Sequence, residues 1–267
     1  MLRAPAVAGQ FYPGRTDALR EQLAQLVPAD VEKRPAFGVM APHAGYIYSG
    51  GVAGKLFAGI AIPPEVVILG PNHHGVGAQV AVDTRSGWAT PLGNVPIAAE
   101  LAAAVLAACP LATADTEAHR FEHSLEVQVP FLQVMAGSFV IVPICLGRVS
   151  LEQLLELGDG LAAAMRTRET LPLLVASSDM THYESADAAR HKDQLALKHV
   201  LDLDPEGLYR TVRAERISMC GVLPTVVMLR AALALGATRG ELVAYANSGD
   251  VNGDWRQVVG YAGVVVS

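Results

Sequence analysis

The chain has 267 residues, of which 51% are hydrophobic and 17% are charged, and its formal net charge is −6. This composition excludes an intrinsically disordered, collagen-like or coiled-coil protein, and it supplies enough apolar residues for a large core. The acidic balance, with no cluster of basic residues, argues against a nucleic-acid partner that is held through its phosphates.

Several features of the sequence point to a cytoplasmic protein. No apolar run approaches the roughly 20 residues that a membrane helix needs. The first residues lack the apolar segment of a signal peptide. The three cysteines are too few and too widely spaced for a disulfide framework. We therefore expect no membrane segment.

Short apolar runs alternate with longer helical patterns along the whole chain. Strands are expected over residues 37–41, 65–70, 79–83, 139–146, 171–176, 242–246 and 257–266. Helices are expected over residues 50–60, 97–108, 124–136, 151–166, 188–201 and 221–235. Most of the strand runs are continuously apolar, which is typical of strands buried on both faces. With no break in composition, the pattern predicts a single α/β domain over residues 1–267, whose mostly parallel or mixed central sheet is flanked by helices.

Three of the predicted strands run directly into segments that carry histidine. His43 follows the strand at 37–41, His73 and His74 follow the strand at 65–70, and Asp179 and His182 follow the strand at 171–176. Because the carboxyl ends of parallel strands meet at one edge of a sheet, ligands bind at that edge in open α/β folds. The three segments therefore predict a binding site.

Cys220 directly precedes the last predicted helix. The positive end of a helix dipole favours the thiolate form of a cysteine at that position. Thiolate and neutral imidazole are both good ligands for zinc or iron. The other two cysteines, Cys109 and Cys145, lie within apolar runs and are expected in the core. Three further histidines are expected at the surface: His119, His191 and His199.

The segment Glu122-His123-Ser124-Leu125-Glu126 opens the predicted helix at 124–136 with an unusual density of polar residues. It permits two interpretations. The carboxylates are a capped, acidic first turn that the helix dipole favours, or His123 or Glu126 reaches the predicted site and supports its ligands. Both interpretations stay open at the level of sequence.

Six motifs together are similar to those of one known family, and they extend over essentially the whole chain. They are AGQFYP (8–13), APHAGYIYSG (41–50), ILGPNHHG (68–75), EHSLEVQVPFL (122–132), SSDMTHY (177–183) and ISMCG (217–221). On these residues the sequence resembles the Memo family, which is similar in fold to the class III extradiol dioxygenases of the LigB type. Those dioxygenases hold non-haem Fe(II).

The resemblance implies that His43, His73 and Cys220 are metal ligands. It implies that Asp179 and His182 line the same pocket, with His182 as the acid or base. It also implies that supporting residues surround the ligands, for which the candidates are His74, His123, Glu126 and Tyr48. Fe(II) is the expected metal, with zinc or copper as alternatives.

One departure from the dioxygenases matters for function. They complete their site with a carboxylate, whereas Cys220 stands at that position here. Ring cleavage is therefore not carried over, and whether Cys220 or Asp179 completes the ligand set stays open. The resemblance implies a redox or oxygen-linked enzyme of unassigned substrate, and it names a radical SAM protein as a candidate partner.

Two other functions are compatible with the same residues. The first is a non-catalytic module that binds a peptide or small ligand, for which the pocket rim offers the aromatic residues Phe11, Tyr12, Tyr46 and Tyr48. The second is a hydrolase that uses Cys220 as nucleophile, His182 as base and Asp179 as the orienting carboxylate.

Overall fold

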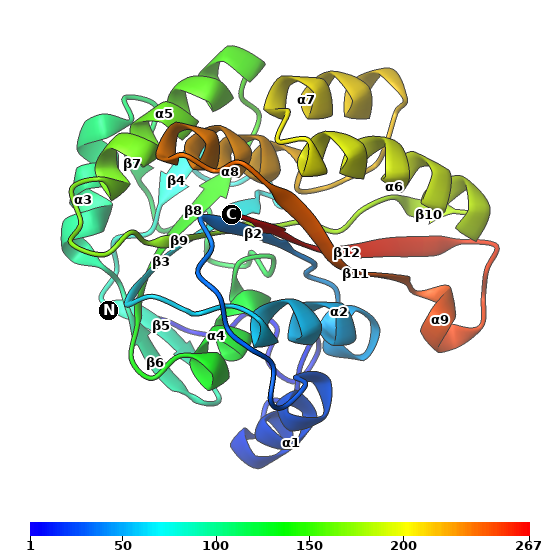
Figure 1. The fold of residues 1–267 in the computed structure, drawn as a ribbon. Helices are drawn as coiled ribbons and strands as arrows, with labels where there is room; N and C mark the ends of the chain where they lie inside the picture. Colours follow the sequence, from blue (N-terminus) through cyan, green and yellow to red (C-terminus); the bar gives the residue numbers. More distant parts are fainter.

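A mixed β-sheet of nine strands runs through the computed structural model, which describes residues 1–267 (Figure 1). Its four central strands are parallel neighbours: β2 (Gly38–Ala41), β9 (Leu173–Ser177), β3 (Glu65–Pro71) and β8 (Val140–Leu146). Nearly all of their residues are buried, because helices cover both faces of the sheet. The expected α/β fold is confirmed, and the apolar runs are explained by this two-sided burial.

The outer strands make the sheet mixed. On one side, β12 (Val258–Val266) runs antiparallel to β2 and also pairs with β11 (Gly240–Asn247) and β10 (His182–Glu184). On the other side, β4 (Val80–Val82) runs antiparallel to β8 and parallel to β7 (Thr113–Ala114). A separate three-stranded sheet consists of β1 (Leu2–Arg3), β5 (Gly87–Thr90) and β6 (Gly93–Pro96).

Helices lie on both sides of the central strands (Figure 1). On one side, α8 (Val222–Leu235) packs on β2, β3 and β9, and against α5 (Leu151–Met165), which contacts α3 (Ala99–Ala108). On the other side, α2 (Tyr46–Ala58) contacts β2 and β12 and packs against α4 (Val129–Met135) and α1 (Thr16–Leu26). The remaining helices are α6 (Ala186–Leu201), α7 (Pro205–Ala214) and the short α9 (Gly249–Asn252). None of these helices combines the length and apolar character that crossing a bilayer requires.

The predicted elements differ from the structure in several places. The short strands β1, β5, β6, β7 and β10 and the short helix α9 were not expected. Helices α1 and α7 were not expected, because each is largely polar and buries only two or three side chains. The helix expected over 124–136 is split into a 3-10 turn (Glu126–Gln128) and α4. Pro130 limits it, since proline lacks an N–H and is tolerated only in the first helical turn. Helix α2 begins at Tyr46, four residues earlier than expected.

A buried ion pair joins β1 to the segment before α4. The Arg3 guanidinium donates to Glu126 Oε2 and to the backbone carbonyls of His119 and Glu122, each at 2.6 Å, and it lies 4.2 Å from the ring centroid of Trp88. Both Arg3 and Glu126 are 1% exposed. A charge pair so fully removed from water is stable only when hydrogen bonds satisfy both groups, as they do here.

The Glu126 carboxylate also holds the residues that follow β1. It accepts hydrogen bonds from the backbone N–H groups of Ala6 (2.7 Å) and Val7 (3.1 Å) and from the Tyr12 hydroxyl (2.6 Å). Four donors therefore converge on one carboxylate, which fixes the N-terminal segment against the rest of the fold.

His119 was expected at the surface, and that expectation is wrong. The residue is fully buried, and its Nε2 donates to the Ala81 carbonyl at 3.0 Å, while its Nδ1 has no hydrogen-bond partner. Burial lowers the pKa of His119 to about 4, although the neighbouring Asp83 carboxylate acts in the opposite direction.

The first prediction concerns the buried ion pair. Replacing Glu126 with Gln keeps the shape of the side chain but leaves the Arg3 charge buried without a counter-charge. We expect Glu126→Gln to lower the free energy of unfolding by about 3–5 kcal/mol. Urea unfolding at pH 7 measures this change. As a control, Asp159→Asn in the exposed pair with Arg230 should cost less than about 1 kcal/mol; equal losses in the two variants would contradict the prediction.

The second prediction concerns the pH dependence of stability. The pKa of His119 is about 4 in the folded protein and ~6.5 in the unfolded chain. The unfolded chain therefore binds the proton more tightly, and stability is lost as the pH falls from 6.5 towards 4. By pH 5 this loss is about 2 kcal/mol. The variant His119→Gln cannot be protonated, so between pH 7 and pH 5 it should lose less stability than the wild type in urea unfolding. Identical losses would overturn the assignment.

Candidate metal centre

The three segments singled out in the sequence meet at one edge of the sheet, as predicted. Strands β2, β9 and β3 are consecutive neighbours and parallel, so His43, Asp179 and His73 leave the sheet at the same edge. Together with His123, His182 and Tyr261 they line a cavity of about 300 Å³. Residues that lie far apart in the sequence thus form one polar site.

His43 lies deepest in this site and is 2% exposed. Its backbone N–H donates to Asp179 Oδ1 at 2.7 Å. Its Nδ1 is 2.9 Å from Ser177 Oγ, and its Nε2 is 3.1 Å from Cys220 Sγ. Burial, followed by the neighbouring His123 and His73, lowers the pKa of His43 well below its ordinary value. The imidazole is therefore neutral at physiological pH, which is the form that binds a metal.

His73 is held by a buried carboxylate. Glu122 accepts from the His73 backbone N–H at 2.7 Å and from its Nδ1 at 2.8 Å. Burial by itself would raise the pKa of Glu122, but the contacts with His73 and Ser124 outweigh it and hold that pKa well below the usual range. Because the ionised carboxylate can only accept, Nδ1 of His73 carries the proton and Nε2 is left free as a ligand.

His123 completes a group of three imidazoles. Its ring stacks on that of His73, with centroids 4.7 Å apart, and lies 5.5 Å from that of His43. Each of the three residues offers a nitrogen, and the three atoms lie within 4.8 Å of one another. Burial lowers the pKa of His123 to about 4, against the effect of Glu122. Three imidazole nitrogens at this spacing could hold a transition-metal ion.

Cys220 lies next to the same site, in contact with Nε2 of His43. Its Sγ accepts a hydrogen bond from the Asp179 backbone N–H at 3.3 Å, but the residue does not line the cavity. This approach depends on Gly221: a Cβ there would lie 2.3 Å from the Ser177 carbonyl oxygen. Only glycine therefore lets the Cys220 loop come so close to the end of β9.

Asp179 and His182 line the cavity beside the imidazoles. Burial raises the pKa of Asp179 to about 7, although the backbone N–H groups of His43 and Ala44 lower it. His182 Nδ1 donates to the Ser218 carbonyl at 3.0 Å, so its Nε2 is free, and burial lowers its pKa. The Asp179 carboxyl is therefore suited to exchanging a proton near neutral pH, and the free Nε2 of His182 can accept one. Tyr261, on β12, also lines the cavity.

The structure places three of the candidate supporting residues outside the cavity wall. The Glu126 carboxylate binds Arg3 and the N-terminal segment. His74 Nε2 is 3.0 Å from the Phe121 carbonyl on an exposed loop. Tyr48 lies in the first turn of α2 and is partly exposed.

Three supporting residues were missed in the sequence: Glu122, Ser177 and Gln128. All three are fully buried. Glu122 was recognised as part of an acidic segment but not as the partner of His73, since nothing in that segment distinguishes it from Glu126. A signal for Ser177 was its position at the end of the strand that leads to Asp179. The proposed hydrolase relay does not form, because Cys220 contacts His43 and not His182.

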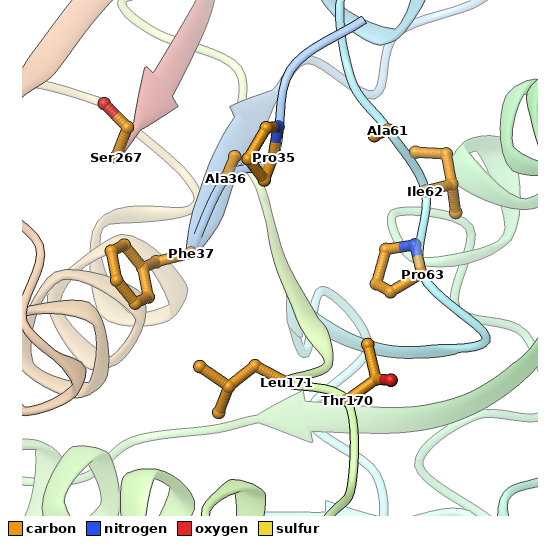
Figure 2. Close-up of a pocket in the computed structure, with 9 residues that line it drawn as sticks. All are labelled: Pro35, Ala36, Phe37, Ala61, Ile62, Pro63, Thr170, Leu171 and Ser267. Carbon is orange, nitrogen blue, oxygen red and sulfur yellow. The ribbon is translucent and has the colours of Figure 1, made fainter.

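A larger cavity lies elsewhere and has a different chemistry. It has a volume of about 580 Å³ and is lined mainly by apolar residues, among them Phe37, Ile62, Pro63 and Leu171 (Figure 2). No titratable side chain lines it. The smaller cavity, with its imidazoles and carboxylate, is therefore the candidate functional site.

Comparisons with known proteins show the family of the chain. Residues 3–265 match the family described as Memo-like protein. A MEMO1 family protein of Methanopyrus kandleri is 44% identical, with 99% of each chain covered, and one of Aquifex aeolicus is 43% identical, with 99% of this chain and 98% of the relative covered. In fold, the chain is similar to the crystal structure of uncharacterized protein JW3007 from Escherichia coli K12, with a TM-score of 0.56 and 16% identity over 84% of this chain and 98% of that one. By identity and coverage, this chain belongs to the Memo-like protein family.

Proposed function

We propose that the chain is a metal-dependent enzyme of redox or oxygen-linked type, with a transition-metal ion bound at the edge of the sheet. The observation that carries this proposal is the convergence of His43, His73 and His123, whose nitrogens lie within 4.8 Å of one another, beside the Cys220 thiol. His43, His73 and Cys220 are the proposed ligands, and His123 is a further donor on the cavity side.

The donor set suits iron, zinc or copper rather than magnesium or calcium. Imidazole and thiolate are the ligands that these transition metals prefer, whereas the hard cations require oxygen donors. The carboxylate behind His73 has the arrangement that commonly orients a metal-bound histidine. Iron is the proposed metal, by resemblance to the dioxygenases. When bound, such an ion supplies Lewis-acid or redox chemistry.

The residues of the chain have separate tasks in this proposal. His182 Nε2 faces the cavity and takes or returns a proton. The Asp179 carboxyl, whose pKa is about 7, holds or releases a proton beside His43. Phe11, Val259 and Tyr261 form an apolar and aromatic wall that separates a bound substrate from water.

A binding module without catalysis is the second candidate. Its support is Tyr183, which lines the cavity yet is 72% exposed, so its ring is available to a peptide or small ligand at the mouth. The two functions differ in their dependence on metal. Binding that survives metal removal and the Cys220→Ser substitution, with no turnover of any compound, would favour the module.

The third prediction concerns metal content. After anaerobic purification, elemental analysis should find near-stoichiometric iron in the wild type. We expect His43→Ala, His73→Ala and Cys220→Ser to lower the occupancy at least about tenfold, because each removes a proposed ligand. His74→Ala serves as the matched control, since it removes the imidazole next to His73 that bonds the Phe121 carbonyl outside the cavity, and it should keep most of the metal.

Two results would change this assignment. If Cys220→Ser keeps the metal and His123→Ala loses it, the third ligand is the His123 imidazole and not the Cys220 thiolate. Absence of any transition metal from wild-type protein, before and after reconstitution with Fe(II), Zn²⁺ or Cu⁺, would refute the proposal.

The fourth prediction concerns the thiol in metal-free protein. Burial and then the Asp179 carboxylate raise the pKa of Cys220 well above its ordinary value. Because only the thiolate reacts, iodoacetamide should label Cys220 at pH 7 at least about tenfold more slowly than free cysteine, and the rate should climb as the pH rises above 9. Mass spectrometry measures the label, with Cys220→Ser as background. Fast, stoichiometric labelling at pH 7 would indicate an activated nucleophile instead.

A further inference from the structure

The hydroxyl of Ser177 contacts the His43 ring at Nδ1, and Ser177 is fully buried. Ser177 is the last residue of β9, and its Oγ contacts three polar groups: the Ser124 carbonyl oxygen at 2.6 Å, the Gln128 amide nitrogen at 2.8 Å and His43 Nδ1 at 2.9 Å. A hydroxyl has one proton and two lone pairs, so three partners saturate it. The direction of each bond can therefore be worked out.

The Ser124 carbonyl decides where the Ser177 proton goes. A carbonyl oxygen can only accept, so the contact at 2.6 Å takes the single proton of the hydroxyl. Ser177 Oγ then has only lone pairs for its other two neighbours, and each of them has to donate.

The Gln128 amide is oriented by a second carbonyl. Its Nε2 lies 2.9 Å from the Pro42 carbonyl oxygen as well as 2.8 Å from Ser177 Oγ. With the amide reversed, two oxygens would face each other at Pro42, so the nitrogen has to lie on this side. The Gln128 Oε1 is buried and has no partner, so all the polar contacts of this amide are made by its nitrogen.

We propose that Ser177, locked by Gln128, is a positioning residue that holds His43 in the tautomer with its proton on Nδ1. The lone pair on Nε2 is then directed at the metal position beside Cys220. This inference rests on the metal site proposed above, which it deepens. It also makes the two histidine ligands unlike: a neutral hydroxyl supports His43, whereas the Glu122 carboxylate supports His73. A carboxylate partner raises the basicity of an imidazole, so His73 is the stronger of the two electron-pair donors to the proposed metal.

The tautomer can be measured in metal-free protein by ¹⁵N NMR of the histidine side chains. In the wild type we expect the His43 signals of a neutral ring with a protonated Nδ1 and an unprotonated Nε2. In Ser177→Ala, Nδ1 loses its acceptor, and the population should shift towards protonated Nε2. A protonated Nε2 in the wild type would overturn the inference, whatever the variants do.

Zn²⁺ affinity provides the second measurement. We expect Ser177→Ala to bind Zn²⁺ roughly 10–100-fold more weakly than the wild type, and Gln128→Met, which keeps the Ser177 hydroxyl, to lose less. Ser49→Ala is the matched control, because Ser49 is also buried and its hydroxyl bonds only the Ala44 carbonyl. Its affinity should stay within about twofold of wild type.

The two measurements separate this inference from the proposed function. If wild-type protein binds no Zn²⁺ or iron, the proposed function fails, while the NMR spectrum still tests the tautomer. If Ser177→Ala is folded by circular dichroism and keeps both the wild-type tautomer and the wild-type affinity, Ser177 has no positioning role. If it does not fold, the wild-type spectrum together with the Gln128→Met affinity decides.

Discussion

The site depends on one constraint: β2, β9 and β3 are parallel neighbours, so their carboxyl ends have to meet. Helices cover both faces of these strands, and the edge is where polar groups can gather around a cavity. His43, Asp179 and His73 take their positions from the register of the sheet rather than from local loop structure. A shift in the pairing of any of the three strands would separate the imidazoles.

The segment over residues 122–128 connects this edge to the rest of the fold. Glu122 holds His73, the Ser124 carbonyl accepts from Ser177, and Gln128 bonds both Ser177 and the Pro42 carbonyl. Within the same segment, Glu126 binds the N-terminal residues through Arg3. Gly70 allows the segment to lie on the end of β3, because a Cβ there would be 2.4 Å from the Leu125 side chain. The polar groups of this segment form hydrogen bonds with the site and with β1. The segment does not form a regular α-helix.

The amino-acid sequence predicted the central strands and the convergence of three loops, because two-sided burial produces continuous apolar runs and parallel order follows from the alternation with helices. It did not predict α1 or α7, whose polar surfaces hide the few side chains they bury. The sequence also did not predict the pairing of Glu122 with His73. Glu122 and Glu126 lie in the same segment and are equally buried, and only the tertiary fold sends one carboxylate to the site and the other to Arg3. The burial of His119 likewise depends on a residue far away in the sequence, because its ring bonds the carbonyl of Ala81 in β4.

The wide spacing of the donors along the chain has a consequence for biosynthesis. His43, His73, His123 and Cys220 belong to different elements, and no two of them are near neighbours in the sequence. An unfolded chain therefore offers no local chelate that would capture an ion, unlike a zinc finger, whose closely spaced ligands bind as it folds. If the chain binds a metal as proposed, the sheet has to assemble first, and only the folded protein would acquire the ion. Loading would then be a separate event, governed by the supply of the ion in the cell, and it would add stability by mass action to a fold that already exists.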